Sequence, residues 1–407
     1  MYPLNKEPLK ETNEPTDSLA FATHANQHND VNRIVNALQD KIGIENDPNT
    51  SSLDFRVKTL ESTSGGAGAV EPPKTFAYLA PYKPRAEIEA FRDEFITGKK
   101  KMWATYWELV NFDVAGAPIF LTESGSLSKF SSSNYNLIKE ISDTVLMGVV
   151  GRIDDVTSNV SVMLADSGRR STAITLIYQK VQEHGFGGVY INFEPTTKIQ
   201  NPENVKIFIQ ELRAQLGDNY VISFSGPMSW DTDKTQNKVY DNVNYTGESN
   251  LQGTNHNSYT VNDMHAWGVD IVEMMCYDQY YDFGTATHSV TSYSQFADAN
   301  NFLNSRLSVD NTAVSIGNYG IETPQGDAYS NLTNNMTRAD INAKDSTFFT
   351  TATERVGTGY LHKDVGANAI IGANQRTVQT YYDIAVSQGR KYIGFWLMGD
   401  HPFPTIK

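Results

Sequence analysis

The chain has 407 residues, of which 39% are hydrophobic, and its formal net charge at pH 7 is −14. This length fits one large domain with an accessory segment, and no apolar run is long enough to form a membrane helix. The only basic run, Lys99–Lys101, is short, so nucleic-acid binding is not expected. The single cysteine, Cys276, excludes an intramolecular disulfide and a cysteine-based zinc site.

Residues 1–61 are predicted to form a short helical segment. Five apolar residues between Val31 and Ile42 recur at helical spacing, Gly43 is a plausible stop, and a second short helix is expected over Ser52–Leu60. Two short helices cannot bury their apolar stripes alone. The segment therefore either associates with other copies or a larger assembly, or packs as a small hairpin on the main domain.

This segment resembles the N-terminal attachment region of bacteriophage tail fibres. The resemblance rests on HANQHNDVNRIVNALQDKIGI, which starts at His24, followed by SSLDFRVKTLES, which starts at Ser51. It implies a virion protein of the phage tail that acts at the host cell surface. Other tail proteins would be its partners through this segment, and the protein could be a homotrimer. His24 and His28 are four residues apart, but such a pair is more often polar or capping than metal-binding, so no metal site is expected.

Residues 62–71 (STSGGAGAVE) are expected to be a flexible linker, and residues 72–407 a (β/α)8 barrel. Apolar strand-like runs alternate with amphipathic stretches, as in parallel βα units. The eight predicted strands are Thr75–Ala80, Lys101–Leu109, Val145–Val150, Gly188–Glu194, Tyr220–Ser225, Val269–Tyr277, Ala313–Tyr319 and Lys391–Met398. The predicted helices are Ala86–Ile96, Tyr135–Ile141, Ser171–His184, Val205–Leu216, Tyr293–Leu307 and Val378–Gln388. No glycine-rich phosphate loop follows any strand, and no cofactor is expected.

Two long polar connections, Asp231–Trp267 and Gly320–Ala373, are predicted to follow strands at the carboxyl face of the barrel. Connections of this length inside a compact domain are usually functional or locally folded. Both would wall a groove at that face, where such barrels keep their chemistry.

The predicted strand ends carry polar and aromatic side chains suited to a sugar ligand. Alternation places Tyr190, Asn192 and Glu194 on one face of their strand, which Pro195 ends. The other candidates are Trp230 after the fifth strand, Met275, Tyr277 and Asp278 on the sixth, and Trp396 and Asp400 on the eighth. Tyr and Trp offer flat amphipathic surfaces for stacking on sugars, although burial in the loop layer suits them equally.

These strand ends resemble glycoside hydrolase families 18, 20 and 85, above all the family 18 chitinases and endo-β-N-acetylglucosaminidases. The family 18 motif on strand four is D-G-x-D-x-D-x-E, and residues 187–194 read GGVYINFE. The glycine, the aromatic residue before the acid and the acid match, whereas Gly187, Tyr190 and Asn192 replace the three aspartates. The family's M-x-Y-D is matched by residues 275–278, and its strand-eight tryptophan by Trp396. The Asn-x-Glu of residues 192–194 is similar to family 85.

The resemblance implies retaining hydrolysis of glycans that contain N-acetylhexosamine, assisted by the substrate's own acetamido group. Glu194 would be the acid/base, and Asn192 would hold the amide in place of the family 18 aspartate. Tyr277 and Asp278 would complete the catalytic set. Tyr190, Trp396, Met275, Trp230 and Asp400 would bind substrate. The ligand would be a host-surface polysaccharide or peptidoglycan-type glycan.

Two other functions stay open at this stage. The protein could be a glycan-binding adhesin of the virion tail with little or no turnover, or a structural virion protein with a vestigial cleft. An isolated glutamate at a strand end is often only a surface or salt-bridged residue, and three aspartates of the family motif are missing.

Overall fold

The computed structural model describes residues 71–96, 101–122, 127–152, 157–194, 202–227, 229–230, 239–240, 261–277, 290–324, 333–354 and 358–406. The predicted helical segment 1–61, with His24 and His28, and the linker up to residue 70 lie outside these ranges. In the described part, no helix is both long and apolar enough to cross a bilayer.

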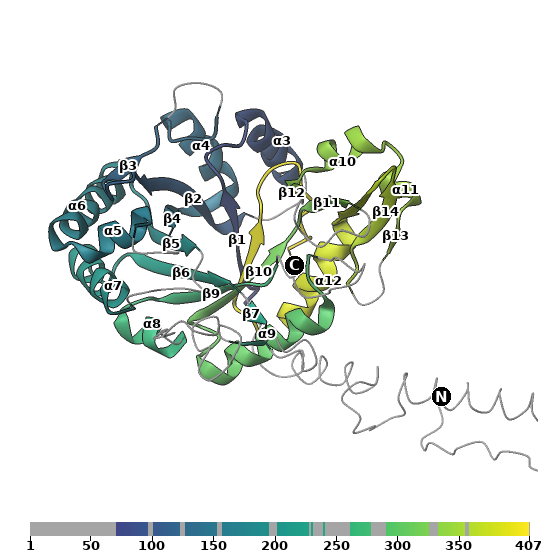
Figure 1. Ribbon diagram of the computed structural model, residues 1–407. Helices are drawn as coiled ribbons and strands as arrows, with labels where there is room; N and C mark the ends of the chain where they lie inside the picture. Colours follow the sequence, from purple (N-terminus) through teal and green to yellow (C-terminus); the bar gives the residue numbers. More distant parts are fainter. Residues whose placement is uncertain are drawn as a thin grey trace, which may run out of the picture. The chain divides into compact units, whose positions relative to one another are not determined.

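Eight parallel strands close into a barrel, as predicted (Figure 1). They are β1 (Lys74–Leu79), β2 (Met102–Phe112), β4 (Ser142–Arg152), β5 (Gly188–Glu194), β6 (Val221–Pro227), β9 (Ile271–Met275), β10 (Thr312–Gly317) and β16 (Tyr392–Trp396). Their order is β1-β16-β10-β9-β6-β5-β4-β2, and pairing between β1 and β2 closes the ring. A short strand, β3 (Pro118–Phe120), pairs antiparallel with the outer part of β2. Each of the eight predicted strands overlaps one of the barrel strands, although β2 and β4 extend further than expected.

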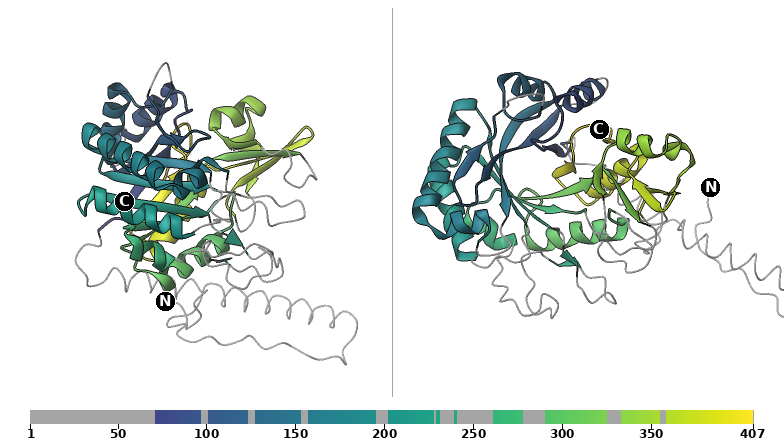
Figure 2. Two further views of the ribbon diagram at one scale, coloured as in Figure 1. Left: turned by 60° about the vertical axis from the view of Figure 1, so that its left-hand side comes forward. Right: turned by 45° about the horizontal axis from the view of Figure 1, so that its top comes forward.

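Helices surround the barrel (Figure 2). They are α3 (Arg85–Ile96), α4 (Ser132–Ile141), α5 (Asn159–Ala165), α6 (Ser167–His184), α7 (Pro202–Leu216), α8 (Val261–Trp267), α9 (Tyr293–Arg306) and α12 (Gln375–Ser387). The six predicted helices are confirmed. Helix α6 precedes β5, the strand that carries Asn192 and Glu194. The helix begins where the Asp166 side chain accepts from the amide of Arg169, and it ends at Gly185, which has a left-handed conformation. These two caps fix where α6 begins and where it ends, three residues before β5 begins at Gly188.

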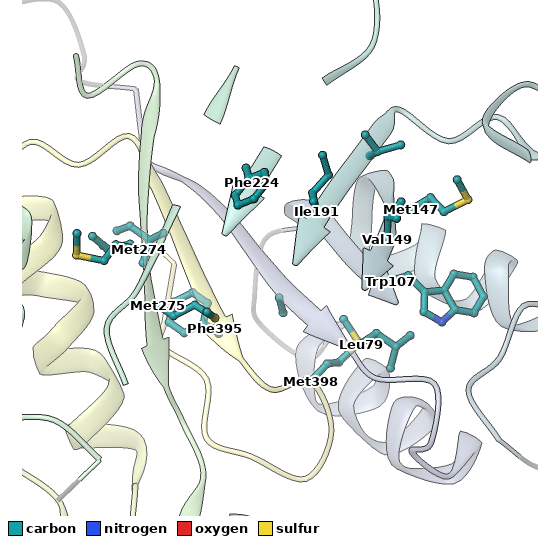
Figure 3. Close-up of a cluster of buried hydrophobic side chains, with 14 of the residues drawn as sticks. Leu79, Trp107, Met147, Val149, Ile191, Phe224, Met274, Met275, Phe395 and Met398 are labelled. Atoms are coloured by element: carbon teal, nitrogen blue, oxygen red, sulfur yellow. The ribbon is translucent and has the colours of Figure 1, made fainter. Parts of the chain in front are cut away.

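Alternation along the strands separates two layers of core. The outward side chains pack under the helices, among them Trp107, Met147, Ile191 and Phe224 (Figure 3). The inward side chains form an unusually aromatic interior in which Phe76 stacks on Tyr106 with ring centroids 4.2 Å apart. Polar inward side chains form hydrogen bonds with the hydroxyls of these buried tyrosines, among them Ser223, Glu273 and Ser315.

The predicted connection Gly320–Ala373 is locally folded. It forms an antiparallel sheet, in the order β12-β11-β15-β14-β13, between β10 and α12. Its elements are β11 (Gly320–Pro324), β12 (Thr333–Met336), α10 (Arg338–Lys344), α11 (Phe348–Thr351), β13 (Thr353–Glu354), β14 (Leu361–Val365) and β15 (Asn368–Gly372). Within the other long connection, the structure describes α8 and the short strand β8 (Val239–Tyr240), which pairs with β7 (Ser229–Trp230) just before the connection. We call the folded connection Gly320–Ala373, with its five-stranded sheet, the inserted sheet.

Candidate functional site

The carboxyl ends of the barrel strands bring several predicted site residues to one mouth. Glu194 is the last residue of β5, Trp396 is the last residue of β16, and Tyr277 follows the end of β9 by two residues. All three strands are parallel members of the same closed sheet, so these positions lie at one end of the barrel. The side chain of Glu194 and the whole of Asp278 lie outside the described residues.

Tyr277 and Trp396 form an aromatic pair at this mouth. Their rings are stacked with centroids 6.1 Å apart and an angle of 21° between the planes. Tyr277 is buried, whereas Trp396 is partly exposed and is joined to Leu397 by a cis peptide bond. A partly exposed indole backed by a second ring offers the flat surface that a sugar ring can stack on.

Trp396 also makes a polar contact that the sequence did not indicate. Its Nε1–H donates to Oδ1 of Asn335, on β12 of the inserted sheet, at 2.8 Å. The inserted sheet therefore takes part in the mouth of the barrel. Asn335 was missed because a single asparagine in a long polar stretch has no pattern that marks it.

Asn192 is two residues before Glu194 on the inward face of β5 and is 6% exposed. Its strand neighbour Ile191 pairs with Phe224 of β6, so the residues that follow, Asn192 and Ser225, are adjacent on the inward face. An asparagine amide has both an acceptor oxygen and donor hydrogens. Asn192 thus offers a nearly buried amide close to the end of β5.

Of three other predicted substrate-binding residues, two are buried, and the side chain of the third lies outside the described residues. Tyr190 is fully buried inside the barrel, with its ring 5.2 Å from that of Tyr78 and 4.8 Å from that of Tyr106, so it lies below the mouth. Met275 is buried at the end of β9. Trp230 belongs to β7, and its side chain lies outside the described residues.

Asp400 has structural contacts. One of its carboxylate oxygens accepts from Arg338 Nε at 3.0 Å, and the other accepts from the amide of Ala339 at 2.8 Å. Both partners belong to the start of α10, where a carboxylate is favourable. Asp400 thereby ties the chain after β16 to the inserted sheet.

A second carboxyl group lies deeper in the barrel. Glu273 of β9 is 2% exposed and accepts hydrogen bonds from Tyr78, Ser315 and Ser225, the last at 2.6 Å. Burial raises the pKa of this carboxyl from 4.5 to about 8, although the hydrogen bond from Ser315 opposes the shift. Alternation along β9 puts Glu273 on the same face as Met275 and Tyr277, but no sequence motif distinguishes it.

The raised pKa of Glu273 predicts a pH-dependent stability. Between pH 4.5 and about 8 the folded protein holds a proton that the unfolded chain releases, so the contribution of this group is complete below pH 4.5 and is lost as the pH rises to about 8. We expect Glu273→Gln to gain stability relative to the wild type as the pH rises through this window, by on the order of a few kcal/mol. Denaturant unfolding of both proteins at pH 5 and pH 9 measures this difference. An equal difference at both pH values would contradict the assignment.

The described residues give no support for metal or thiol chemistry. Among them, no three His, Cys, Asp or Glu side chains are close enough together to hold a metal ion. Cys276 is fully buried, and burial raises the pKa of its thiol, which disfavours the reactive thiolate.

Comparisons with known proteins found similar solved structures but no similar sequence. No family model matches the sequence, and no curated protein matches it either. Among solved structures, the spore cortex-lytic enzyme SleL from Bacillus cereus is similar with a TM-score of 0.60 and 15% identity, over 83% of this chain and 73% of that one. A chitinase from Chromobacterium violaceum is similar with a TM-score of 0.58 and 16% identity, over 81% of this chain and 95% of that one.

A class V chitinase from Pseudomonas fluorescens is similar to the same degree. Its TM-score is 0.57 at 15% identity, over 81% of this chain and 96% of the other. At this level of identity the likeness establishes the architecture. The described part of the chain has the (β/α)8 barrel architecture that it shares with these chitinases and with the spore cortex-lytic enzyme.

Proposed function

We propose that the protein is a glycoside hydrolase that cleaves glycans containing N-acetylhexosamine. The similar structures support the chemical class, since they include enzymes described as chitinases and as a spore cortex-lytic enzyme. The resemblance of residues 187–194, 275–278 and 396 to the family 18 motifs supports the same class independently. A host-surface polysaccharide or peptidoglycan-type glycan is the proposed substrate.

In the proposed mechanism the substrate provides the nucleophile, which is one of the exceptions to the two-carboxylate rule. The acetamido oxygen attacks the anomeric carbon, the glycosidic bond breaks, and Glu194 gives its proton to the leaving oxygen. Water then attacks the same carbon from the opposite side and gives its proton to Glu194, while the bond between that carbon and the acetamido oxygen breaks and restores the acetamido group. The two inversions together retain the anomeric configuration.

The remaining residues hold the acetamido group and the sugar. Asn192 would accept a hydrogen bond from the acetamido N–H, and Tyr277 would donate its hydroxyl to the acetamido oxygen. Trp396 would form the floor of the sugar subsite, and Asp278 would orient the amide. Met275 and Trp230 would add apolar contact.

The observation that supports this function most directly is the pairing of Tyr277 with Trp396. Their stacked rings, 6.1 Å apart, join the ends of β9 and β16 at the mouth where β5 ends in Glu194. The aromatic platform and the acid thus lie at the same end of the barrel, as acid-catalysed cleavage of a stacked sugar requires. Neither component alone would distinguish a sugar site from a packed loop layer.

A binding function without turnover is the second candidate. It is favoured by the missing aspartates, since Tyr190 is buried among rings and Asn192 has no charge to stabilise a cationic intermediate. A virion adhesin that keeps the sugar groove would need Trp396 and Tyr277 but not Glu194.

We also propose that residues 1–61 attach the barrel to a phage tail. The support is the resemblance of HANQHNDVNRIVNALQDKIGI and SSLDFRVKTLES to tail-fibre attachment regions. Other tail proteins would then be the partners of this segment, trimerisation would be expected, and the barrel would act at the host surface.

N-acetylated oligosaccharides test the hydrolase proposal. We expect the protein to release reducing ends from N-acetylglucosamine oligomers and not from de-N-acetylated oligomers of equal length, because only the former carry the internal nucleophile. Proton NMR of early products should show the retained β-anomer. Binding without release of reducing ends would favour the adhesin, and cleavage of both oligomers or an inverted first product would exclude substrate assistance.

A further inference from the structure

Trp396 is held by two separate parts of the chain. From the barrel, the Tyr78 ring of β1 lies 5.2 Å from the indole, and the Tyr277 ring lies 6.1 Å from it. From the inserted sheet, Asn335 accepts the indole N–H at 2.8 Å. The rings limit the plane of the indole, and the hydrogen bond limits its rotation within that plane.

Tyr78, which contacts Trp396 from the barrel, is itself held in place by hydrogen bonds. The hydroxyl of Tyr78 donates to Glu273 and lies 3.3 Å from the hydroxyl of Ser315. Tyr78 is fully buried, so its ring has no room to turn away from Trp396. The support beneath the indole is therefore rigid.

The inserted-sheet side is anchored as well. Asn335 has a φ of +56°, a left-handed conformation that asparagine tolerates better than most residues. Immediately after β12, Thr337 caps α10, and the amide of Arg338 donates to the carbonyl of Asp400 at 2.9 Å. Arg338 also forms an ion pair with the Asp400 carboxylate at 3.0 Å. The segments on both sides of the Asn335–Trp396 hydrogen bond are thus tied together only a few residues away from it.

We propose that Asn335 is a positioning residue that sets the orientation of Trp396, so that the inserted sheet determines the geometry of the sugar subsite. This inference rests on the proposed function, in which Trp396 is the sugar platform. An indole has a single polar donor, and a partly buried acceptor opposite it selects one of the orientations that the surrounding rings allow. In this role Asn335 acts on the substrate through the tryptophan.

A role of this kind affects substrate binding more than chemistry. Loss of the hydrogen bond weakens the platform equally for the bound substrate and for the transition state, which raises KM and leaves kcat nearly unchanged. We expect Asn335→Gly, which accepts the positive φ, to raise KM roughly three- to tenfold, the range for one net hydrogen bond. Asn335→Asp keeps the acceptor and should return KM to within about twofold of the wild type.

The matched control is Asn368→Gly, in the same sheet. Asn368 of β15 donates to Glu322 of β11 at 2.8 Å, a bond within the inserted sheet, so its loss should affect stability without a change in KM. Melting temperatures of all variants separate a structural effect from a positioning effect. An equal rise in KM for the Asn335 and Asn368 variants would overturn the proposal.

A double-mutant cycle with Trp396→Phe gives the sharpest test, because phenylalanine has the ring without the N–H. In the Phe background, Asn335→Gly should change KM less than twofold, since its partner is absent. The same rise in both backgrounds, or a fall in kcat as the main effect, would overturn the proposal.

The test also separates this inference from the proposed hydrolysis. If the wild type binds N-acetylglucosamine oligomers without cleaving them, hydrolysis is rejected, and calorimetric Kd values replace KM in the same cycle. Coupling in Kd would then still support the role of Asn335. If the wild type cleaves and the cycle shows no coupling, the inference alone fails, and if it neither cleaves nor binds, both fail.

Discussion

Glu194→Gln is expected to abolish hydrolysis of N-acetylglucosamine oligomers and to leave their binding intact. The glutamine keeps the size of the side chain but cannot give a proton to the leaving oxygen or take one from water. General acid–base catalysis typically contributes about a hundred- to ten-thousandfold to the rate. We expect kcat to fall by at least this factor, with little change in Kd. Reducing-end assays and calorimetry on the same preparation measure the two quantities.

The matched control is Glu203→Gln on the exposed face of α7. Glu203 forms a surface ion pair with Lys206 at 3.0 Å, an interaction of small energetic weight, so kcat and Kd should stay at wild-type values. A Glu194 variant that retains hydrolysis would remove this residue from the mechanism. A wild type that binds but does not cleave would instead favour the adhesin, in which Glu194 has no catalytic task.

The barrel could be predicted from the sequence because its strands and helices carry strong local signals. Apolar β-branched runs such as Gly188–Glu194 and stripes such as that of Ser171–His184 repeat with the periods of strand and helix. Parallel strands buried on both faces read as nearly continuous apolar runs, which leaves little ambiguity. Because the strands are parallel and the sheet is closed, the strand ends that carry candidate site residues then lie at one mouth of the barrel.

The inserted sheet could not be predicted because its strands are short and several of them are polar. Leu361–Val365 and Thr333–Met336 show no sustained alternation, and they are stabilised by antiparallel partners distant in sequence. The hydrogen bond from Trp396 to Asn335 spans 61 residues, so only the folded chain brings the two together. A site residue that such an insertion supplies, like Asn335, is therefore not marked by any pattern in the sequence around it.

The departure from the family motif at Gly187 has a physical explanation in the neighbouring strand. A Cβ added at this position would overlap the hydroxyl oxygen of Thr144 and would lie 3.3 Å from the Cβ of Thr144, at the start of β4. An aspartate at position 187 would therefore need another rotamer of Thr144 or a smaller residue at position 144. The sequence shows the missing aspartate, but the side chain that fills its place appears only in the structure.

Gly188→Ala is expected to destabilise the barrel severely, at the strand that carries the proposed catalytic residues. Gly188 has a φ of +151°, and a Cβ there would lie 2.6 Å from the backbone nitrogen of Val221 and closer still to its carbonyl oxygen. Real Cβ atoms do not approach backbone this closely, so β5 and β6 would have to separate where Gly188 pairs with Val221. Overpacking of a core costs about 1–3 kcal/mol or more, and here the unfavourable backbone conformation adds to it. We expect a loss of several kcal/mol in the free energy of unfolding, or a failure to fold.

Gly185→Ala separates the two causes of this loss. Gly185 ends α6 with a φ of +68°, but a Cβ there would have no atom within 4 Å. Its substitution should therefore cost only the left-handed conformation, about 1–2 kcal/mol. Denaturant unfolding of the two variants compares a left-handed glycine in open space with one pressed against a neighbouring strand. If Gly188→Ala cost no more than Gly185→Ala, the close approach of β5 to β6 would not be what requires a glycine. Asn192 and Glu194 would then owe their placement at the mouth to other contacts of the strand.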